Sequence, residues 1–196
     1  MRKITAIFLA AIFLMTGSAC FAEGLSNGDF EYTTDGVLTA YYGSKEVAVP
    51  AWIDGTEIKK IGDKMCFDLD ISTAYIDDGV EEIGKSAFEG SNLTYINAAL
   101  SMVKIDERAF ANCKELNSVV LNSENVQFGK DVFAGTGYIE FIVPCTADTA
   151  SFGKKIEETK GDNNFGFENM HTALTESMTE KDIYGENMIY CEACGF

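Results

Sequence analysis

Histidine, basic side chains and long apolar runs are all scarce in this 196-residue sequence. His171 is the single histidine, and no nucleophile motif or pair of carboxylates frames it, so no catalytic residue is expected. Only 15 lysines and arginines stand against 31 acidic residues. This balance argues against nucleic acid and anionic lipid as partners, because both require basic patches. We therefore expect neither an enzyme nor a nucleic-acid-binding protein.

The longest apolar run, Ile4–Met15, is too short to span a bilayer comfortably. Two basic residues precede it and small residues follow, which is typical of a secretory signal peptide in residues 1–22, cleaved after Ala22. A second interpretation is a loose bacterial lipobox ending at Cys20, which would then be lipidated, although Gly17 stands where Leu or Val is usual. The sequence ends without a hydrophobic stretch or sorting motif. We therefore expect a protein that is released or held only by a lipid at Cys20.

The remaining 174 residues, 23–196, suffice for one domain with a real core. Without Arg2 and Lys3 they carry 13 basic against 31 acidic residues, a formal charge of −18. Such a surface keeps an extracellular protein soluble through self-repulsion. The acidic clusters lack the ligand spacing of EF-hands and of nonapeptide repeats, so no metal site and no cofactor is predicted.

Between about Val47 and Val143 the sequence repeats itself. Four segments resembling Ile-Gly-x-x-Ala-Phe start 22, 22 and 23 residues apart, at Ile61, Ile83, Ile105 and Phe128. A fixed period of this size is typical of a solenoid, in which stacked units bury what one unit cannot. We predict that one phenylalanine per unit joins a continuous ladder, with one extra residue in the first unit: Phe67, Phe88, Phe110 and Phe133.

Each unit also contains a short strand with alternating inward residues. The inward pairs are Ala74 and Ile76, Ile96 and Ala98, Val119 and Leu121, and Phe141 and Val143. Another apolar residue lies three positions upstream, at Ile71, Leu93, Leu116 and Tyr138. The second cluster of each unit is preceded by Ile58, Val80, Met102 and, less well, Asn125. The Gly-x-x-Ala-Phe part suits a short helical or irregular turn that closes the back of each coil.

This unit, Leu-x-x-Val-x-Leu followed by Ile-Gly-x-x-Ala-Phe and x-x-Cys-x-x-Leu, resembles the BspA-type leucine-rich repeat. The clearest copy is Ile105–Leu121, which includes Cys113. The resemblance implies an α/β repeat solenoid, a right-handed leucine-rich-repeat coil with terminal caps. It would carry short parallel strands on one face and turns and short helical segments on the other. It also implies a secreted or surface-exposed protein, of a bacterium or a host-associated protist, in a family often linked to adhesion.

Three parts follow the signal peptide. Residues 23–46 are predicted to form an N-terminal cap hairpin, because an Asp-Gly turn joins the runs Phe30–Tyr32 and Val37–Tyr42. Residues 47–144 form the solenoid of about four to five coils, and residues 145–196 lack the repeat columns and form a C-terminal cap or tail. In that tail we expect helices at Thr149–Lys160 and Met170–Thr179 and a strand at Asp182–Tyr190.

The residues between the inward positions of each strand should face outward and offer a ligand-binding surface. They are Thr73 and Tyr75, Tyr95 and Asn97, Ser118 and Val120, and Glu140 and Ile142. The apolar members among them fit two readings. They either reflect β-propensity on a partly covered sheet or form a recognition strip anchored by Tyr75 and Tyr95.

Five cysteines follow Cys20. Cys66 and Cys113 sit in repeat columns and are predicted to be buried and unpaired. Cys191 and Cys194 are expected to form a local disulfide, or one of them pairs with Cys145, in an oxidising compartment. A zinc site would need two more ligands, and no second close pair exists.

We thus expect a monomeric protein, secreted or at the cell surface, that recognises an extracellular protein or glycan through its strand residues. The alternative is a structural envelope protein whose repeats serve self-association. Fold alone does not settle this choice.

Overall fold

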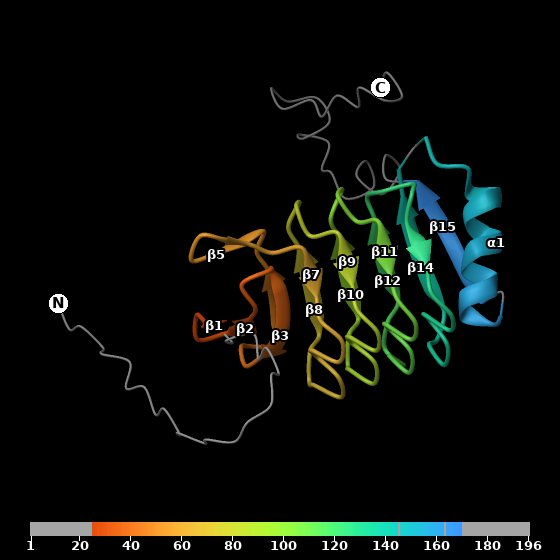
Figure 1. Cartoon of the computed structure of the whole chain (residues 1–196). Helices are drawn as coiled ribbons and strands as arrows, with labels where there is room; N and C mark the ends of the chain where they lie inside the picture. Colours follow the sequence, from red (N-terminus) through yellow and green to blue (C-terminus); the bar gives the residue numbers. More distant parts are fainter. Residues whose placement is uncertain (1–24, 145, 163, 170–196) are drawn as a thin grey trace, which may run out of the picture.

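The computed structural model describes residues 25–144, 146–162 and 164–169. In these residues the chain winds into a solenoid whose coils follow one another from the red N-terminal end to the blue C-terminal end of Figure 1. Each coil contributes one strand to each of two sheets, which face each other across the core. The predicted repeat solenoid of short parallel strands is therefore confirmed.

The first sheet has six strands, all parallel, in the order β15-β14-β12-β10-β8-β4. Their bounds are Glu46–Val49 (β4), Thr73–Ile76 (β8), Tyr95–Ala98 (β10), Ser118–Leu121 (β12), Ile139–Val143 (β14) and Phe165–Asn169 (β15). The second sheet has seven strands in the order β1-β2-β3-β7-β9-β11-β13. Their bounds are Leu25–Ser26 (β1), Phe30–Tyr32 (β2), Val37–Tyr41 (β3), Lys60–Ile61 (β7), Glu82–Ile83 (β9), Lys104–Ile105 (β11) and Gln127–Phe128 (β13).

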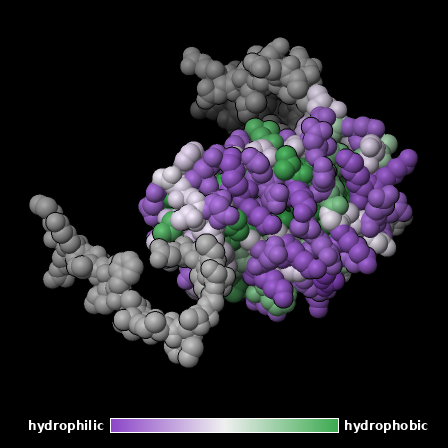
Figure 2. All heavy atoms as spheres, viewed as in Figure 1, coloured by the Kyte–Doolittle hydropathy of each residue, from purple (hydrophilic) through white to green (hydrophobic). Residues whose placement is uncertain are grey.

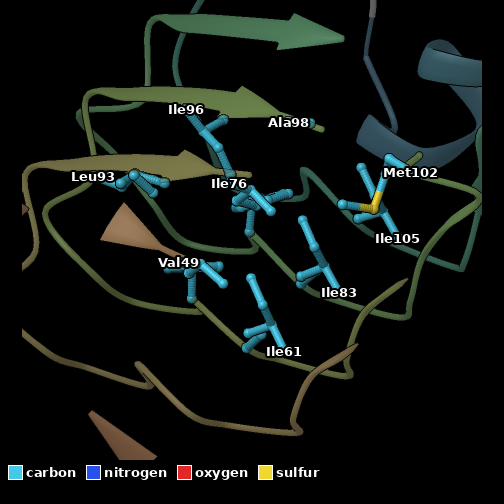
Figure 3. Close-up of a cluster of buried hydrophobic side chains, with 14 of the residues drawn as sticks. Val49, Ile61, Ile76, Ile83, Leu93, Ile96, Ala98, Met102 and Ile105 are labelled. Carbon is cyan, nitrogen blue, oxygen red and sulfur yellow. The ribbon is translucent and has the colours of Figure 1, made fainter. Parts of the chain in front are cut away.

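The core between the sheets is built from the predicted columns. All eight inward strand residues, from Ala74 to Val143, are buried. In Figure 3, Val49, Ile76 and Ala98 of the six-stranded sheet lie opposite Ile61, Ile83 and Ile105 of the seven-stranded sheet. Because each coil presents the same two apolar rows, the stack buries one continuous core.

The last coil departs from two of these columns by one residue. Tyr138 was predicted to be inward but is 50% exposed, and its neighbour Ile139 is fully buried instead. In the same way Val126, rather than Asn125, fills the position before the last turn segment. The last turn segment lies 23 rather than 22 residues after the preceding one, because Phe128 pairs with Ile105. The strands keep the 22-residue spacing, but β14 begins one residue earlier in the register than β12, so the strand alternation turns Ile139 inward.

The segment after each glycine is a run of tight turns. Its amides alternate: the N–H of Phe88 donates to the Ala109 carbonyl of the next coil, whereas the N–H of Glu89 turns back to the Ser86 carbonyl. The same alternation recurs in neighbouring coils, for example at Phe110 and Ala111. The alternatives of a short helix and an irregular turn are thus resolved in favour of turns.

The phenylalanine ladder has three members, not four. Phe88, Phe110 and Phe133 stack with ring centroids 5.5 and 5.6 Å apart. The predicted fourth member, Phe67, is 39% exposed and has the Lys64 ammonium 5.6 Å from its ring centroid. Cys66 takes the ladder position, because its N–H donates to the Ala87 carbonyl as the N–H of Phe88 does one coil later. The first unit therefore has no extra residue, and Met65 rather than Cys66 shares the column of Ala87.

The N-terminal hairpin forms as predicted from its turn. β2 and β3 pair antiparallel, and Gly36 adopts a φ of 81° in the turn between them. β3 then pairs parallel with β7, so the hairpin extends the seven-stranded sheet over the end of the core. A second hairpin, β5 (Trp52–Ile53) and β6 (Thr56–Glu57), turns at Asp54-Gly55, both with positive φ. That turn is the kind whose twist suits a two-residue hairpin.

The C-terminal end is covered by the helix α1, Thr149–Lys160, as predicted. The Asp148 carboxylate accepts the Ala150 N–H at its start, and Gly161 ends it in the left-handed conformation. Phe152 and Ile156 are buried, and the Thr159 carbonyl accepts the N–H of Phe133 from the last coil. Strand β15 follows and was not predicted. The expected helix at Met170–Thr179 and strand at Asp182–Tyr190 lie outside the described residues.

Candidate functional site

The candidate site is the outward side of the six-stranded sheet. We call it the strand face and define it by two outward residues per strand. These are Glu46 and Ala48, Thr73 and Tyr75, Tyr95 and Asn97, Ser118 and Val120, Glu140 and Ile142, and Gly166 and Glu168. All eight residues predicted to face outward are among them.

The parallel register brings these residues into two rows. Tyr95 lies beside Thr73 on one side and Ser118 on the other, while Asn97 lies between Tyr75 and Val120. Neighbouring strands are about 4.8 Å apart, so the six strands extend over about 24 Å. A face of this length can contact a short extended segment.

Tyr75 and Tyr95 form an aromatic pair on this face. Their ring centroids are 5.6 Å apart with the planes tilted by 48°. Tyr75 is 47% exposed, whereas Tyr95 is half-buried. Burial, and then the nearby Tyr75, raise the pKa of the Tyr95 hydroxyl, so it remains a neutral donor at physiological pH. The pair thus presents apolar ring surface together with hydroxyl groups.

Polar groups accompany the rings. The Asn97 amide oxygen accepts a hydrogen bond from Asn122 Nδ2 at 2.8 Å. The Thr73 hydroxyl, beside Tyr95 in register, is buried and has no hydrogen-bond partner among the described residues. A buried hydroxyl without a partner is uncommon, because its desolvation is not offset.

The apolar side chains of the second row are less exposed than predicted. Val120 points outward but is only 8% exposed, and Ile142 is half-buried. Val120 lies between Asn97 and Ile142 in the register, so neighbours on both sides cover its small side chain. Of the three residues in this row that were predicted to be exposed and apolar, only Tyr75 is exposed.

Glu140 is held at the C-terminal end of the face. It accepts a hydrogen bond from the Tyr138 hydroxyl. Gly166 of the next strand leaves room for both side chains, because a Cβ there would lie 2.3 Å from Tyr138 Oη and 2.6 Å from Glu140 Oε2. The exposed Tyr138 therefore acts as a support for Glu140.

Four members of the face were missed from the sequence, two at each end. Glu46 and Ala48 of β4 lie 27 residues before their partners in β8 rather than 22, because the β5–β6 hairpin is inserted between the strands. Gly166 and Glu168 of β15 follow a helix, which also breaks the period. The alternation of Phe165 and Phe167 was the one signal for β15, and both rings pack against Phe141.

The remaining candidates fall into two groups. Cys66 and Cys113 are buried and free, as predicted, and burial raises their thiol pKa to about 12 and about 11. Cys20, Cys145, Cys191, Cys194 and His171 lie outside the described residues, as does the predicted signal peptide. In residues 25–144, 146–162 and 164–169, no three His, Cys, Asp or Glu side chains gather as metal ligands would.

No helix in the described part of the chain has the length and apolar character needed to cross a bilayer.

Residues 51–156 match the BspA type leucine rich repeat region, in six copies. The chain belongs to this family. No curated protein matches the sequence. The columns that carry the fold, including Cys113 and the stacked phenylalanines, are therefore repeat features of a BspA-type protein rather than features of a separate site.

Solved structures agree with this fold. A leucine-rich repeat protein of T. pallidum superposes with a TM-score of 0.53 at 24% identity, covering 61% of this chain and 64% of that one. A leucine-rich repeat protein of Bacteroides capillosus superposes with a TM-score of 0.54 at 19% identity, covering 74% of this chain and 98% of that one. The BspA-type chain thus spans less than two thirds of the T. pallidum protein and nearly all of the B. capillosus protein. At these identities the likeness concerns the fold.

Proposed function

We propose that this BspA-type chain is an extracellular recognition module that binds a protein or glycan partner through the strand face. The observation that carries the proposal is the tilted Tyr75–Tyr95 pair on the outward side of a parallel sheet. Rigid aromatic side chains that combine ring surface with a hydroxyl are enriched at the energetic centres of interfaces. Membership of a repeat family supports an interaction role, because solenoids build extended binding surfaces.

The location belongs to the same proposal. The apolar run and small residues up to Ala22 fit export, with the mature chain either secreted or retained at the surface through a lipid on Cys20. Members of this family are typically surface-exposed or secreted, which agrees with it. Mass spectrometry of the mature N-terminus distinguishes the two forms, because only lipidation leaves Cys20 as the first residue.

The proposal also includes a monomeric state. The open edge of β4 is blocked at Glu46, whose carbonyl oxygen lies 3.1 Å from the hydroxyls of both Tyr41 and Ser44. Edge strands with occupied backbone groups are poor templates for pairing with a second copy. Size-exclusion chromatography with light scattering tests the self-association alternative, which requires an oligomer that grows with protein concentration and is lost on mutation of the strand face.

The binding test uses immobilised extracellular-matrix proteins and a panel of glycans. Combined alanine substitution of Tyr75, Tyr95 and Ile142 should abolish binding to whichever of these the native protein captures. The melting temperature should change little, because Tyr75 is half-exposed and none of the three lies in the core between the sheets. A matched variant, Tyr42→Ala with Trp52→Ala, removes two aromatic residues that are 64% and 60% exposed elsewhere and should bind normally.

If the triple variant melts much earlier and still binds, the three residues are structural and the strand face is not the site.

A further inference from the structure

We propose that the partner of the strand face is a protein segment rich in arginine or lysine, which lies extended across the two tyrosines. This inference rests on the proposed function and names the chemistry of its partner. It follows from the distribution of charge between the two sheets of the solenoid.

Every charged residue of the strand face is acidic. Its twelve outward residues include three glutamates, Glu46, Glu140 and Glu168, and no lysine or arginine. No ion pair joins any of the three to another residue in the described ranges. Lys45, the basic residue next to Glu46 in sequence, is paired with Asp70 at 2.5 Å. The face therefore offers negative charge that the described part of the fold does not neutralise.

The opposite sheet is built differently. Its outward residues alternate in sign from coil to coil, as in Lys60, Glu82 and Lys104. Ion pairs connect successive coils there, Lys60 to Glu82 at 3.5 Å and Lys85 to Glu107 at 2.8 Å. The absence of lysine from the strand face is therefore not a consequence of the low overall lysine content. Five lysines lie on or beside the other sheet: Lys59, Lys60, Lys85, Lys104 and Lys130.

The acids surround the aromatic pair. Glu46 lies in the same row as Tyr95, two strands away across Thr73, and Glu140 lies two strands away on the other side across Ser118. Glu168 ends the second row, which contains Tyr75. An extended chain lying across these strands would therefore meet acid, tyrosine and acid in turn.

Such an arrangement suits guanidinium and ammonium groups. A cation over a tyrosine ring is attracted by the ring quadrupole, and carboxylates on either side strengthen that attraction. A partner carrying sulfate, sialic acid or acidic side chains would be repelled by the same carboxylates. A neutral glycan would use the tyrosines without needing the glutamates. Because all three charged residues of the face are negative, a cationic segment is favoured over both of these partners.

The test measures binding of a fluorescein-labelled synthetic peptide of alternating arginine and valine by fluorescence anisotropy. The expected affinity for the native protein falls about tenfold or more when NaCl is raised from about 0.05 to about 0.5 M. The variant with Glu46→Gln, Glu140→Gln and Glu168→Gln should bind about tenfold more weakly. A peptide with glutamate in place of every arginine should not bind.

A control variant distinguishes binding at the strand face from nonspecific attraction of the peptide to an acidic protein. Glu115→Gln, Glu157→Gln and Glu158→Gln together remove three charges from exposed residues that are not part of the strand face. This control should keep native affinity for the arginine peptide. Equal weakening by both triple variants would overturn the inference, because net charge alone would then explain binding.

Two further results distinguish this inference from the proposed function. If Tyr75→Ala with Tyr95→Ala abolishes capture of a matrix protein or neutral glycan while the glutamate variant captures it normally, the strand face is a site but its partner is not cationic. If the tyrosine variant retains all binding, the proposed function fails as well. Circular dichroism and thermal melting of every variant confirm that the comparison is made between folded proteins.

Discussion

Cys66 occupies in its coil the position that Phe88 occupies in the next coil. The Cys66 N–H donates to the Ala87 carbonyl at 2.7 Å, and the Phe88 N–H donates to the Ala109 carbonyl at 2.8 Å. A small thiol therefore ends the stack of phenylalanine rings on the N-terminal side of the core. Cys113 is held differently: its Sγ donates to the Phe88 carbonyl at 3.0 Å.

Both thiols should be inert in the native protein. Burial raises the pKa of Cys66 to about 12 and that of Cys113 to about 11, so the reactive thiolate is nearly absent at pH 8. Alkylation with iodoacetamide, mapped by peptide mass spectrometry, should modify neither residue under native conditions and both in guanidinium. Native modification of either would contradict the burial of these columns.

The register of the ladder can be tested with two alanine substitutions. Phe110→Ala should lower the free energy of unfolding by about 3–5 kcal/mol, because it opens a cavity between two stacked rings. Phe67→Ala should cost less than about 1 kcal/mol, because that ring is partly exposed. Urea unfolding followed by circular dichroism measures both. An equal loss of unfolding free energy in the two variants would mean that Phe67 is a member of the ladder.

The ion pair between Glu89 and Arg108 should make stability depend on pH. The Glu89 side chain is only 12% exposed, and the Arg108 guanidinium lowers the pKa of its carboxyl below the ordinary 4.5. The folded state therefore gains stability from the ionised carboxylate above about pH 4.5, and loses it as the pH falls through the lowered pKa.

Glu89→Gln should accordingly cost about 1–3 kcal/mol at pH 7 and much less at pH 3. Denaturant titrations at the two pH values provide the measurement. The exposed substitution Glu115→Gln is the control and should change neither value appreciably. A cost for Glu89→Gln that is the same at both pH values would mean that the ion pair is not the cause.

Two glycines with similar backbone angles should respond differently to alanine. Gly36 has a φ of 81°, and a Cβ there would lie 2.1 Å from the Glu57 carbonyl oxygen. Gly55 has a φ of 84° but open space around it. Gly55→Ala should cost about 1 kcal/mol from backbone strain alone, whereas Gly36→Ala should cost at least about 2 kcal/mol more because backbone must move. Thermal unfolding of both variants measures the two losses of stability. Similar losses would show that the backbone around Gly36 can move to accommodate a Cβ at little cost.

Sequence periodicity predicted the coils and most of the inward columns, because these features repeat. The N-terminal hairpin was predicted from its local Asp-Gly turn, and helix α1 was predicted from its own segment, outside the repeats. Periodicity failed where two apolar residues are adjacent and either can face the core. Cys66 and Phe67 are one such pair, and Tyr138 and Ile139 are another. The choice depends on backbone hydrogen bonds to the next coil, which no single unit encodes.

The position of the strand face was predicted from the sequence, but its two end strands were missed. The eight predicted residues are outward because the strand alternation is regular. Its two ends were missed because β4 and β15 are separated from their neighbours by a hairpin and a helix, which break the spacing. Their glutamates, Glu46 and Glu168, are two of the three charges on which the partner inference depends.

The hydrogen bonds between successive turn segments allow whole coils to be added to the solenoid. Every second N–H of a turn segment donates to a carbonyl of the coil that follows, and Thr159 of α1 supplies one such carbonyl to the last coil. A duplicated 22-residue unit inserted between Leu93 and Leu116 would therefore find its bonding partners on both sides without any change to the hairpin or the helix. Each such duplication would lengthen the strand face by about 4.8 Å. Insertion of whole coils would thus change the length of the strand face without altering the tyrosines and glutamates on which the proposed binding depends.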